Sequence, residues 1–343
     1  MLPAQLDTLR AYVASRQPVG APRDGVRADV ATTVVVVGSG KGGTGTSVVA
    51  AMLALSAAAM GRRVLLADLD EHVGPQRFLL GASPVHGLGA LRRGVAPEAL
   101  LVPVSATLSL LPGGPADAHD AHDAQDTPLA PAERRALLRR AASCFAQHEL
   151  VVVDAGSRLD GVRAGLETAQ AAAQAADGNL AVRLLVVTGS DPIALAASYA
   201  LVKSVASGVA GDASDSPSLP VDVLASRLDD DEARHAFEHL DAAARQFLQQ
   251  PLRFVGCVPD DASLAVALRA GMPLQDAATG SPAAVAMQSV ATTLAAPSPA
   301  TAARGARSAT TPRTTVPGLA PGDRGLRAAA SLAYSGSPQG TAR

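Results

Sequence analysis

A glycine-rich loop follows the first strongly apolar run of the sequence. The loop Gly38-Ser-Gly-Lys-Gly-Gly-Thr-Gly-Thr-Ser47 lies between the valine run 34–37 and the Ala/Val/Leu/Met-rich segment 48–60. A strand, a glycine loop and a helix in this order let backbone N–H groups and the positive end of a helix dipole surround an anion. The spacing from Gly40 to Ser47 is that of the Walker A phosphate loop, G-x-x-x-x-G-K-[ST], except that Thr46 stands at the lysine position. The sequence therefore predicts a phosphate-binding loop without its usual lysine.

Lysine is rare in this chain. It occurs only at Lys41 and Lys203, whereas arginine supplies the other basic side chains. One of two lysines thus lies inside the glycine loop, and we expect Lys41 to have a function there.

Carboxylates end two further apolar runs. Asp68 and Asp70 follow the run 64–67, and Asp154, with Gly156 close behind, follows the run 150–153. Side chains at the carboxyl ends of parallel strands face the ligand crevice of an open sheet. One of Asp68 and Asp70 is a candidate for orienting an attacking water or holding a metal-bound water, and Asp154 is a candidate for holding a Mg²⁺ ion bound to a triphosphate. The structural alternative is that these carboxylates cap turns or helices.

Apolar runs and helical patterns alternate from residue 31 to 295, and this predicts an α/β fold: a doubly wound, mostly parallel sheet with helices on both faces. The runs are nearly continuous Val/Leu stretches, as expected for strands covered on both sides. The predicted strands are 33–37, 64–68, 108–111, 150–154, 183–188, 221–225 and 253–258. The predicted helices are 47–60, 131–147, 161–176, 192–206, 230–249, 261–270 and 282–294.

The chain divides into three parts by composition. Residues 1–30 are predicted to be a leader helix and linker, 31–295 a P-loop NTPase domain, and 296–343 a disordered tail. The tail is rich in Ala, Thr, Ser, Pro, Gly and Arg, and cannot bury enough apolar surface to fold alone.

Overall composition narrows the class of protein. A hydrophobic content of 48% permits a large core, and a net charge of −2 gives no general nucleic-acid footprint, so we expect no nucleic-acid partner. The apolar segment 48–60 is shorter than the ~20 residues that span a bilayer, and no signal peptide is visible. The two cysteines, Cys144 and Cys257, fit small buried side chains in a reducing compartment. We therefore expect a cytoplasmic protein.

Other motifs in the chain admit different interpretations. The spacing Gly38-x-Gly40-x-x-Gly43, with Asp68 or Asp70 as the ribose-binding acid, also fits a dinucleotide fold and a nicotinamide-dependent oxidoreductase. Lys41 and Ser47 argue against it. The pattern His235-x-x-Glu238-His239 matches a zinc protease motif, and residues 119–123 hold a His/Asp cluster. We interpret these two as a polar helix surface and a solvated loop.

The loop and several later segments resemble the MinD/ParA-type P-loop ATPases, and within them the FlhG group of flagellar-number regulators. The stretch Lys41-Gly-Gly-Thr-Gly-Thr-Ser47 resembles their deviant Walker A motif, K-G-G-x-G-K-[ST]. The segments Val186–Pro192, Ser198–Lys203 and Leu268–Pro273 are similar to later family motifs. The resemblance covers about residues 31–295.

The resemblance implies roles for individual residues. Lys41 is similar to the signature lysine that reaches the partner's phosphates in an ATP-bound dimer, and Asp70 would lie near the attacking water. Ser47 would bind Mg²⁺, with Asp154 in the metal's surroundings. The implied ATP-binding residues are Gly40, Lys41, Gly42, Gly43, Thr44, Gly45, Thr46 and Ser47 around the phosphates, and Ser226, Arg227, Pro259 and Asp261 around the adenine.

The resemblance also implies a function. It is that of a regulator whose ATP-dependent homodimer controls the placement or number of a cellular structure such as the flagellum, with ATP and Mg²⁺ as cofactors. The implied partners are an FlhF-like GTPase or another polar-assembly protein, and the membrane at the cell pole. Because Thr46 replaces the lysine that contacts the phosphates, ATP binding is expected to weaken roughly 10- to 100-fold, with weak or absent hydrolysis. A catalytically inactive pseudo-ATPase scaffold is the alternative.

Overall fold

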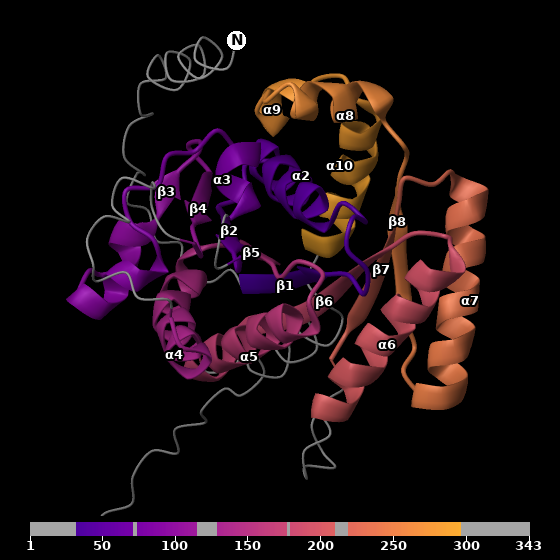
Figure 1. Cartoon of the computed structure of the whole chain (residues 1–343), viewed down its shortest axis with the longest axis horizontal. Coiled ribbons are helices and arrows are strands. Elements are labelled where there is room, and N and C mark those ends of the chain that lie inside the picture. Colours follow the sequence, from indigo (N-terminus) through magenta and orange to yellow (C-terminus); the bar gives the residue numbers. More distant parts are fainter. Residues whose placement is uncertain (1–31, 71–73, 115–128, 177–178, 210–218, 296–343) are drawn as a thin grey trace, which may run out of the picture. The chain divides into compact units, whose positions relative to one another are not determined.

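An eight-stranded sheet runs through the part of the chain that the computed structural model describes (Figure 1). The described residues are 32–70, 74–114, 129–176, 179–209 and 219–295. The predicted leader 1–30, the predicted tail 296–343 and the His/Asp cluster 119–123 lie outside them. None of the described helices is both long enough and apolar enough to cross a membrane.

The strand order is β3-β4-β2-β5-β1-β6-β7-β8, and every neighbouring pair is parallel except β3 with β4. The doubly wound, mostly parallel sheet predicted from the alternating runs is therefore confirmed. The strands are β1 (Thr32–Gly38), β2 (Val64–Asp68), β3 (Val102–Pro103), β4 (Leu108–Leu111), β5 (Leu150–Asp154), β6 (Leu180–Thr188), β7 (Val221–Ser226) and β8 (Arg253–Val258).

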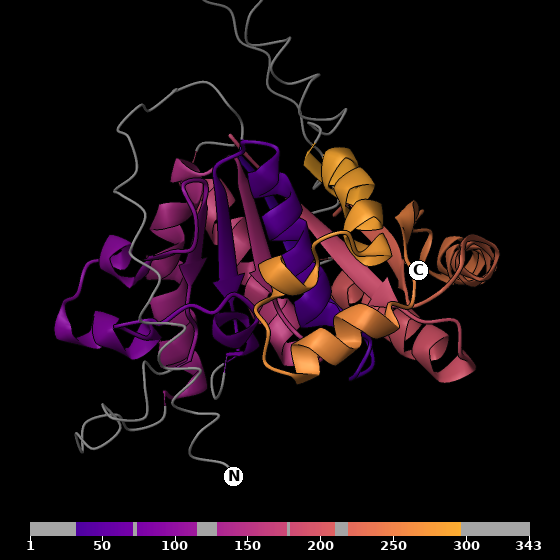
Figure 2. The ribbon, with the colours of Figure 1, turned by 90° about the horizontal axis from the view of Figure 1, so that it is seen from above.

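Helices cover both faces of this sheet, because alternate side chains of each strand point to opposite sides. In β1, Val34 and Val36 join one apolar core and Val35 and Val37 join the other. The first core is covered by α4 (Pro131–Ala141), α5 (Leu159–Ala175), α6 (Pro192–Val209) and α7 (Asp230–Leu248). The second is covered by α2 (Thr46–Ala59), α3 (Pro75–Leu79), α8 (Ala262–Arg269), α9 (Leu274–Ala277) and α10 (Pro282–Ala295), the layer that faces the viewer in Figure 2.

Two predictions need correction. The single helix predicted over 131–147 is α4 followed by a 3-10 helix, Ala142–Gln147; two more 3-10 helices span Leu88–Arg93 and Pro97–Leu100. Cys144 is buried as expected, but Cys257 is half-exposed, and its Sγ lies 3.1 Å from a carboxylate oxygen of Asp230. The environment of Cys257 is therefore polar on one side.

A buried ion cluster joins β6, β7 and β8. Asp222 lies 2.9 Å from the Nε of Arg183 and 2.6 Å from the Nε of Arg253, and the side chains of Asp222 and Arg183 are 1% and 5% exposed. Burial of a charge is costly unless it is paired, so Asp222 compensates the guanidinium of Arg183. The cluster lies near the amino-terminal ends of β7 and β8, whereas the glycine loop follows the carboxyl-terminal end of β1. We therefore infer that the cluster stabilises the fold.

Candidate functional site

The glycine loop connects the end of β1 to the beginning of α2. Gly45 has a φ of +85°, a left-handed conformation that glycine adopts without strain. A Cβ at Gly40 would lie 2.1 Å from the carbonyl oxygen of Ala197 on α6, so a larger residue cannot fit there. These two glycines set the path of the loop and leave the first N–H groups of α2 available for an anion.

Thr46, at the lysine position, is turned into the loop. Its hydroxyl donates to the Oγ of Ser39 at 2.8 Å and lies 3.0 Å from the Oγ1 of Thr44. The Ser39 hydroxyl in turn donates to the carbonyl oxygen of Lys41 at 3.0 Å. Thr46 is only 7% exposed. A network of neutral hydroxyl groups therefore occupies the position at which a Walker A loop usually has the ammonium group of a lysine.

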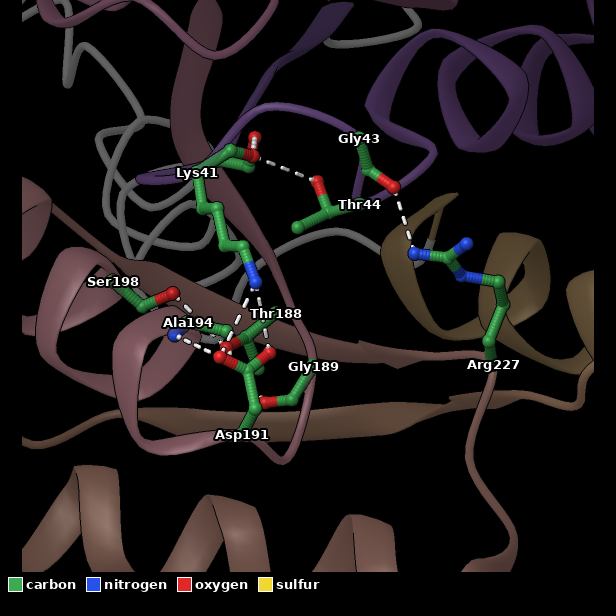
Figure 3. Close-up of polar contacts among 10 residues, drawn as sticks. Lys41, Gly43, Thr44, Thr188, Gly189, Asp191, Ala194, Ser198 and Arg227 are labelled. Carbon is green, nitrogen blue, oxygen red and sulfur yellow. Dashed lines mark hydrogen bonds and ion pairs between the residues drawn. The ribbon is translucent and has the colours of Figure 1, made fainter.

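Lys41 points away from the loop toward the beginning of α6 (Figure 3). Its Nζ lies 3.2 Å from both carboxylate oxygens of Asp191. Asp191 also accepts a hydrogen bond from the amide of Ala194, and this amide and Lys41 lower the pKa of Asp191. The two side chains are 42% and 49% exposed, and pairs so open to solvent contribute little, so Lys41 is free to exchange partners. Asp191 was not predicted as a site residue, because it lies 150 residues from Lys41 in the sequence.

A cleft of about 930 Å³ opens beside the loop. It brings together four of the eight predicted phosphate residues and both predicted metal residues, whereas Gly40, Lys41, Gly42 and Thr44 are not among its lining residues. The lining comprises the loop residues Gly43, Gly45, Thr46 and Ser47, the carboxylates Asp68, Asp70 and Asp154, and basic residues of α4, of α5 and of the segment just before α5, namely Arg134, Arg135, Arg163 and Arg158.

The carboxylates Asp68 and Asp154 are neighbours because β2 and β5 are paired in register at these residues. Both are buried, and burial together with the nearby Asp154 raises the pKa of Asp68 to about 7. Burial also raises the pKa of Asp154. Gln76 of α3 connects the pair: its amide N–H donates to Asp68 at 3.1 Å and its side chain donates to Asp154 at 2.7 Å. Two buried acids at one edge make a site that favours a cation.

The same side chain of Gln76 donates to the carbonyl oxygen of Ser47 at 2.9 Å, and thereby joins the loop to Asp154. Gln76 was not predicted as a site residue, since no local pattern distinguishes it from other residues of a short helix. Hydroxyl and carboxylate oxygens are suitable Mg²⁺ ligands, and Mg²⁺ takes few protein ligands when a phosphate supplies the rest. Ser47 and Asp154 therefore fit the ion expected at this place.

Two of the residues predicted around the adenine, Ser226 and Arg227, lie beside the loop, and neither lines the cleft. The guanidinium of Arg227 donates to the carbonyl oxygen of Gly43 at 2.7 Å (Figure 3). The Oγ of Ser226 lies 3.6 Å from where a Cβ of Gly45 would be. Pro259 follows β8 directly, and the amide of Arg227 is bonded to Val258 at the end of that strand. Ser226 and Arg227 are thus adjacent to the loop, and Pro259 follows the strand residue to which Arg227 is bonded.

Asp261 has a structural task that the sequence did not reveal. It caps α8 by accepting from the amide of Leu264, and the hydroxyls of Ser263 and Ser281 also donate to it at 2.6 Å. These bonds lower the pKa of Asp261 to about 2.

The zinc-like pattern on α7 brings two imidazoles together. The Nε2 atoms of His235 and His239 are 3.1 Å apart on an exposed face. Among the described residues, no group of three or more His, Cys, Asp or Glu side chains is arranged to hold a metal ion. His235, Glu238 and His239 are all exposed on α7, as expected for a polar helix surface.

Comparison with known proteins identifies the family. Residues 35–274 match the CobQ/CobB/MinD/ParA nucleotide binding domain, and the chain belongs to this family of P-loop proteins. The antiactivator FleN of Pseudomonas aeruginosa is 28% identical over 264 residues, which are 75% of this chain and 84% of FleN. The resemblance to MinD/ParA-type ATPases, and to the FlhG group that includes such regulators, is thereby confirmed.

Solved structures share the fold. MinD in the MinC:MinD cell division complex of Aquifex aeolicus matches with a TM-score of 0.55 and 19% identity, over 78% of this chain and 97% of that one. MinD of Pyrococcus horikoshii, complexed with Mg-ADP, matches with a TM-score of 0.54 and 18% identity, over 76% of this chain and 94% of that one. At this identity the likeness supports the fold alone.

Proposed function

We propose that this chain binds ATP with Mg²⁺ in the cleft beside the glycine loop. The observation that supports this best is the cleft itself, where the amino end of α2 and the paired acids Asp68 and Asp154 face one space. Phosphate oxygens take the N–H groups of the loop, from Gly40 to Ser47, and the helix dipole. The Ser47 hydroxyl and the Asp154 carboxylate hold the ion, which neutralises phosphate charge.

The chain acts, in this proposal, as an ATP-dependent homodimer. The Lys41–Asp191 pair is exposed on the surface, so Lys41 can leave Asp191 for the phosphates of a partner's nucleotide. Asp70 lines the same cleft and orients the attacking water if hydrolysis occurs. Ser226, Arg227, Pro259 and Asp261 surround the base on the other side of the loop.

The cellular task we propose is control of the placement or number of a structure such as the flagellum. The similarity to FleN, described as an antiactivator, supports a regulatory role exercised through other proteins. An FlhF-like GTPase or another assembly protein at the cell pole, and the inner membrane there, are the proposed sites of action.

The replacement of the Walker A lysine by Thr46 should affect the rate of ATP hydrolysis more than any other part of the function. Charge builds on the phosphoryl oxygens in the transition state, and the neutral hydroxyl of Thr46 is already bonded to Ser39. We therefore propose slow turnover, with a pseudo-ATPase scaffold as the second candidate. The family match argues against the nicotinamide-dependent alternative.

Titration calorimetry with Mg-ATP, Mg-ADP and NADH tests the binding step. We expect binding of both adenine nucleotides, weaker than is usual for a P-loop with its lysine, and none of NADH. Tight NADH binding without ATP binding would overturn the proposal. A turnover assay on the same sample separates the two candidates, since sustained phosphate release excludes the scaffold.

A further inference from the structure

Positive charge is distributed unevenly around the cleft. On the loop side, Thr46 is neutral and Lys41 is paired with Asp191 outside the cleft. Among the described residues, the basic ones that line the cleft lie on the opposite wall, which is built from α4, α5 and the segment between β5 and α5. They are Arg134, Arg135, Arg158 and Arg163. Of the described residues, those on that wall are therefore the ones placed to supply side-chain cations to a polyphosphate in this cleft.

These four arginines are not equally available. The guanidinium of Arg134 donates to the carbonyl oxygen of Leu69, and that of Arg163 donates to Ser204 on α6 at 3.5 Å. Within the described part of the chain, Arg135 and Arg158 make neither a hydrogen bond nor an ion pair through their side chains. A phosphate can recruit either one without breaking an existing contact.

Of these two arginines, Arg158 directly follows backbone that contacts the glycine loop. The amide of Ser39 donates to the carbonyl oxygen of Gly156 at 3.1 Å. The Oγ of Ser157 lies 3.6 Å from where a Cβ of Gly42 would be. Gly156, which contacts the loop, is only two residues before Arg158. Because consecutive Cα atoms are ~3.8 Å apart, the Cα of Arg158 lies close to the loop. Its long side chain lines the same cleft as Thr46 and Ser47.

We propose that Arg158 supplies the cation for the terminal phosphates of the bound nucleotide, in place of the lysine that is missing at Thr46. This inference rests on the proposed function and adds a specific phosphate-binding residue to it. A guanidinium suits the task because its planar fork donates two parallel hydrogen bonds to phosphate oxygens. Arg158 approaches from the end of β5 rather than from α2, so it contacts the phosphates from the side opposite to a Walker A lysine.

The experiment measures Mg-ATP and Mg-ADP affinity for the full chain and three variants. Arg158→Ala is expected to weaken ATP binding roughly 10- to 100-fold, the effect of one charge-assisted hydrogen bond, and ADP binding by less. Arg158→Lys keeps the charge but loses the bidentate fork, so its ATP affinity should lie between those of the wild type and Arg158→Ala. Arg139→Ala removes an exposed arginine of α4 outside the cleft and should change neither affinity.

A double variant tests whether arginine and lysine serve the same phosphates. Thr46→Lys should raise ATP affinity by a larger factor in the Arg158→Ala background than in the wild type, because in the wild type Arg158 already contacts the same phosphates. Equal ATP affinity of wild type and Arg158→Ala, with both folded by circular dichroism, would overturn the inference while leaving the proposed function intact. Absence of ATP binding by the wild type would instead refute the proposed function, and this inference with it.

Discussion

Restoring the lysine of the phosphate loop by Thr46→Lys is the sharpest perturbation that the structure suggests. A charge-assisted hydrogen bond contributes ~1.5–3 kcal/mol, so ATP should bind roughly 10- to 100-fold more tightly than to the wild type. If Asp70 and Asp154 are otherwise competent, turnover should rise by at least the same factor, because charge on the phosphoryl oxygens grows in the transition state.

The same substitution should lower stability. Thr46 loses its contacts of 2.8 Å to Ser39 and 3.0 Å to Thr44, each worth ~1 kcal/mol. The new ammonium lies at the first residue of α2, where the helix dipole disfavours a cation by up to ~1 kcal/mol without an anion present. Without nucleotide we expect the free energy of unfolding to fall by ~1–3 kcal/mol, and ATP to recover part of that loss.

The assay is calorimetric titration of Mg-ATP into the apo protein, combined with phosphate release and chemical denaturation of the same samples. Thr46→Ala is the matched control, since it removes the hydroxyl network without adding a charge. It should share the loss of stability and show no gain in affinity. The reasoning fails if folded Thr46→Lys binds ATP no more tightly than Thr46→Ala.

Two further predictions concern stability. Asp222→Ala should lower the free energy of unfolding by ~3–5 kcal/mol in urea denaturation, because it leaves Arg183 buried and uncompensated; a loss below ~1 kcal/mol would contradict the ion-cluster assignment. Hydrogen bonds from Ser263 and Ser281 lower the pKa of Asp261 to about 2, so its contribution is present above the unfolded pKa of ~4 and is lost as the pH falls through about 2. Asp261→Asn, which still caps α8, should be less stable at neutral pH and should lack this acid-side loss in melting curves from pH 5 to 2.

Sequence patterns predicted the sheet well for a physical reason. Strands covered on both faces are unbroken Val/Leu runs, and seven such runs correspond to β1, β2 and β4 to β8. The two-residue strand β3 and the short helices α3 and α9 were missed, since elements of this length show no periodicity. The 3-10 continuation of α4 after Ala141 was also read as α-helix, because both kinds of helix share similar residue types.

The candidate site was predictable only where its residues are adjacent in sequence or end a strand. The glycine loop, Asp70 and Asp154 fall in this class. Gln76, Asp191 and Arg158 do not, because their roles depend on contacts made by the folded chain. Gln76 reaches Asp154 across 78 positions, and Lys41 reaches Asp191 across 150. Only tertiary structure reveals such partners.

The central claim is that ATP, bound beside the glycine loop, controls dimerisation through Lys41. Sedimentation velocity of the full chain with saturating Mg-ATP, Mg-ADP or no nucleotide tests it most directly, with Lys41→Ala measured in parallel. We predict a dimer with Mg-ATP, a monomer in the other two conditions, and a Lys41→Ala variant that binds ATP but stays monomeric. A wild type that remains monomeric while its site is saturated with ATP would contradict the account.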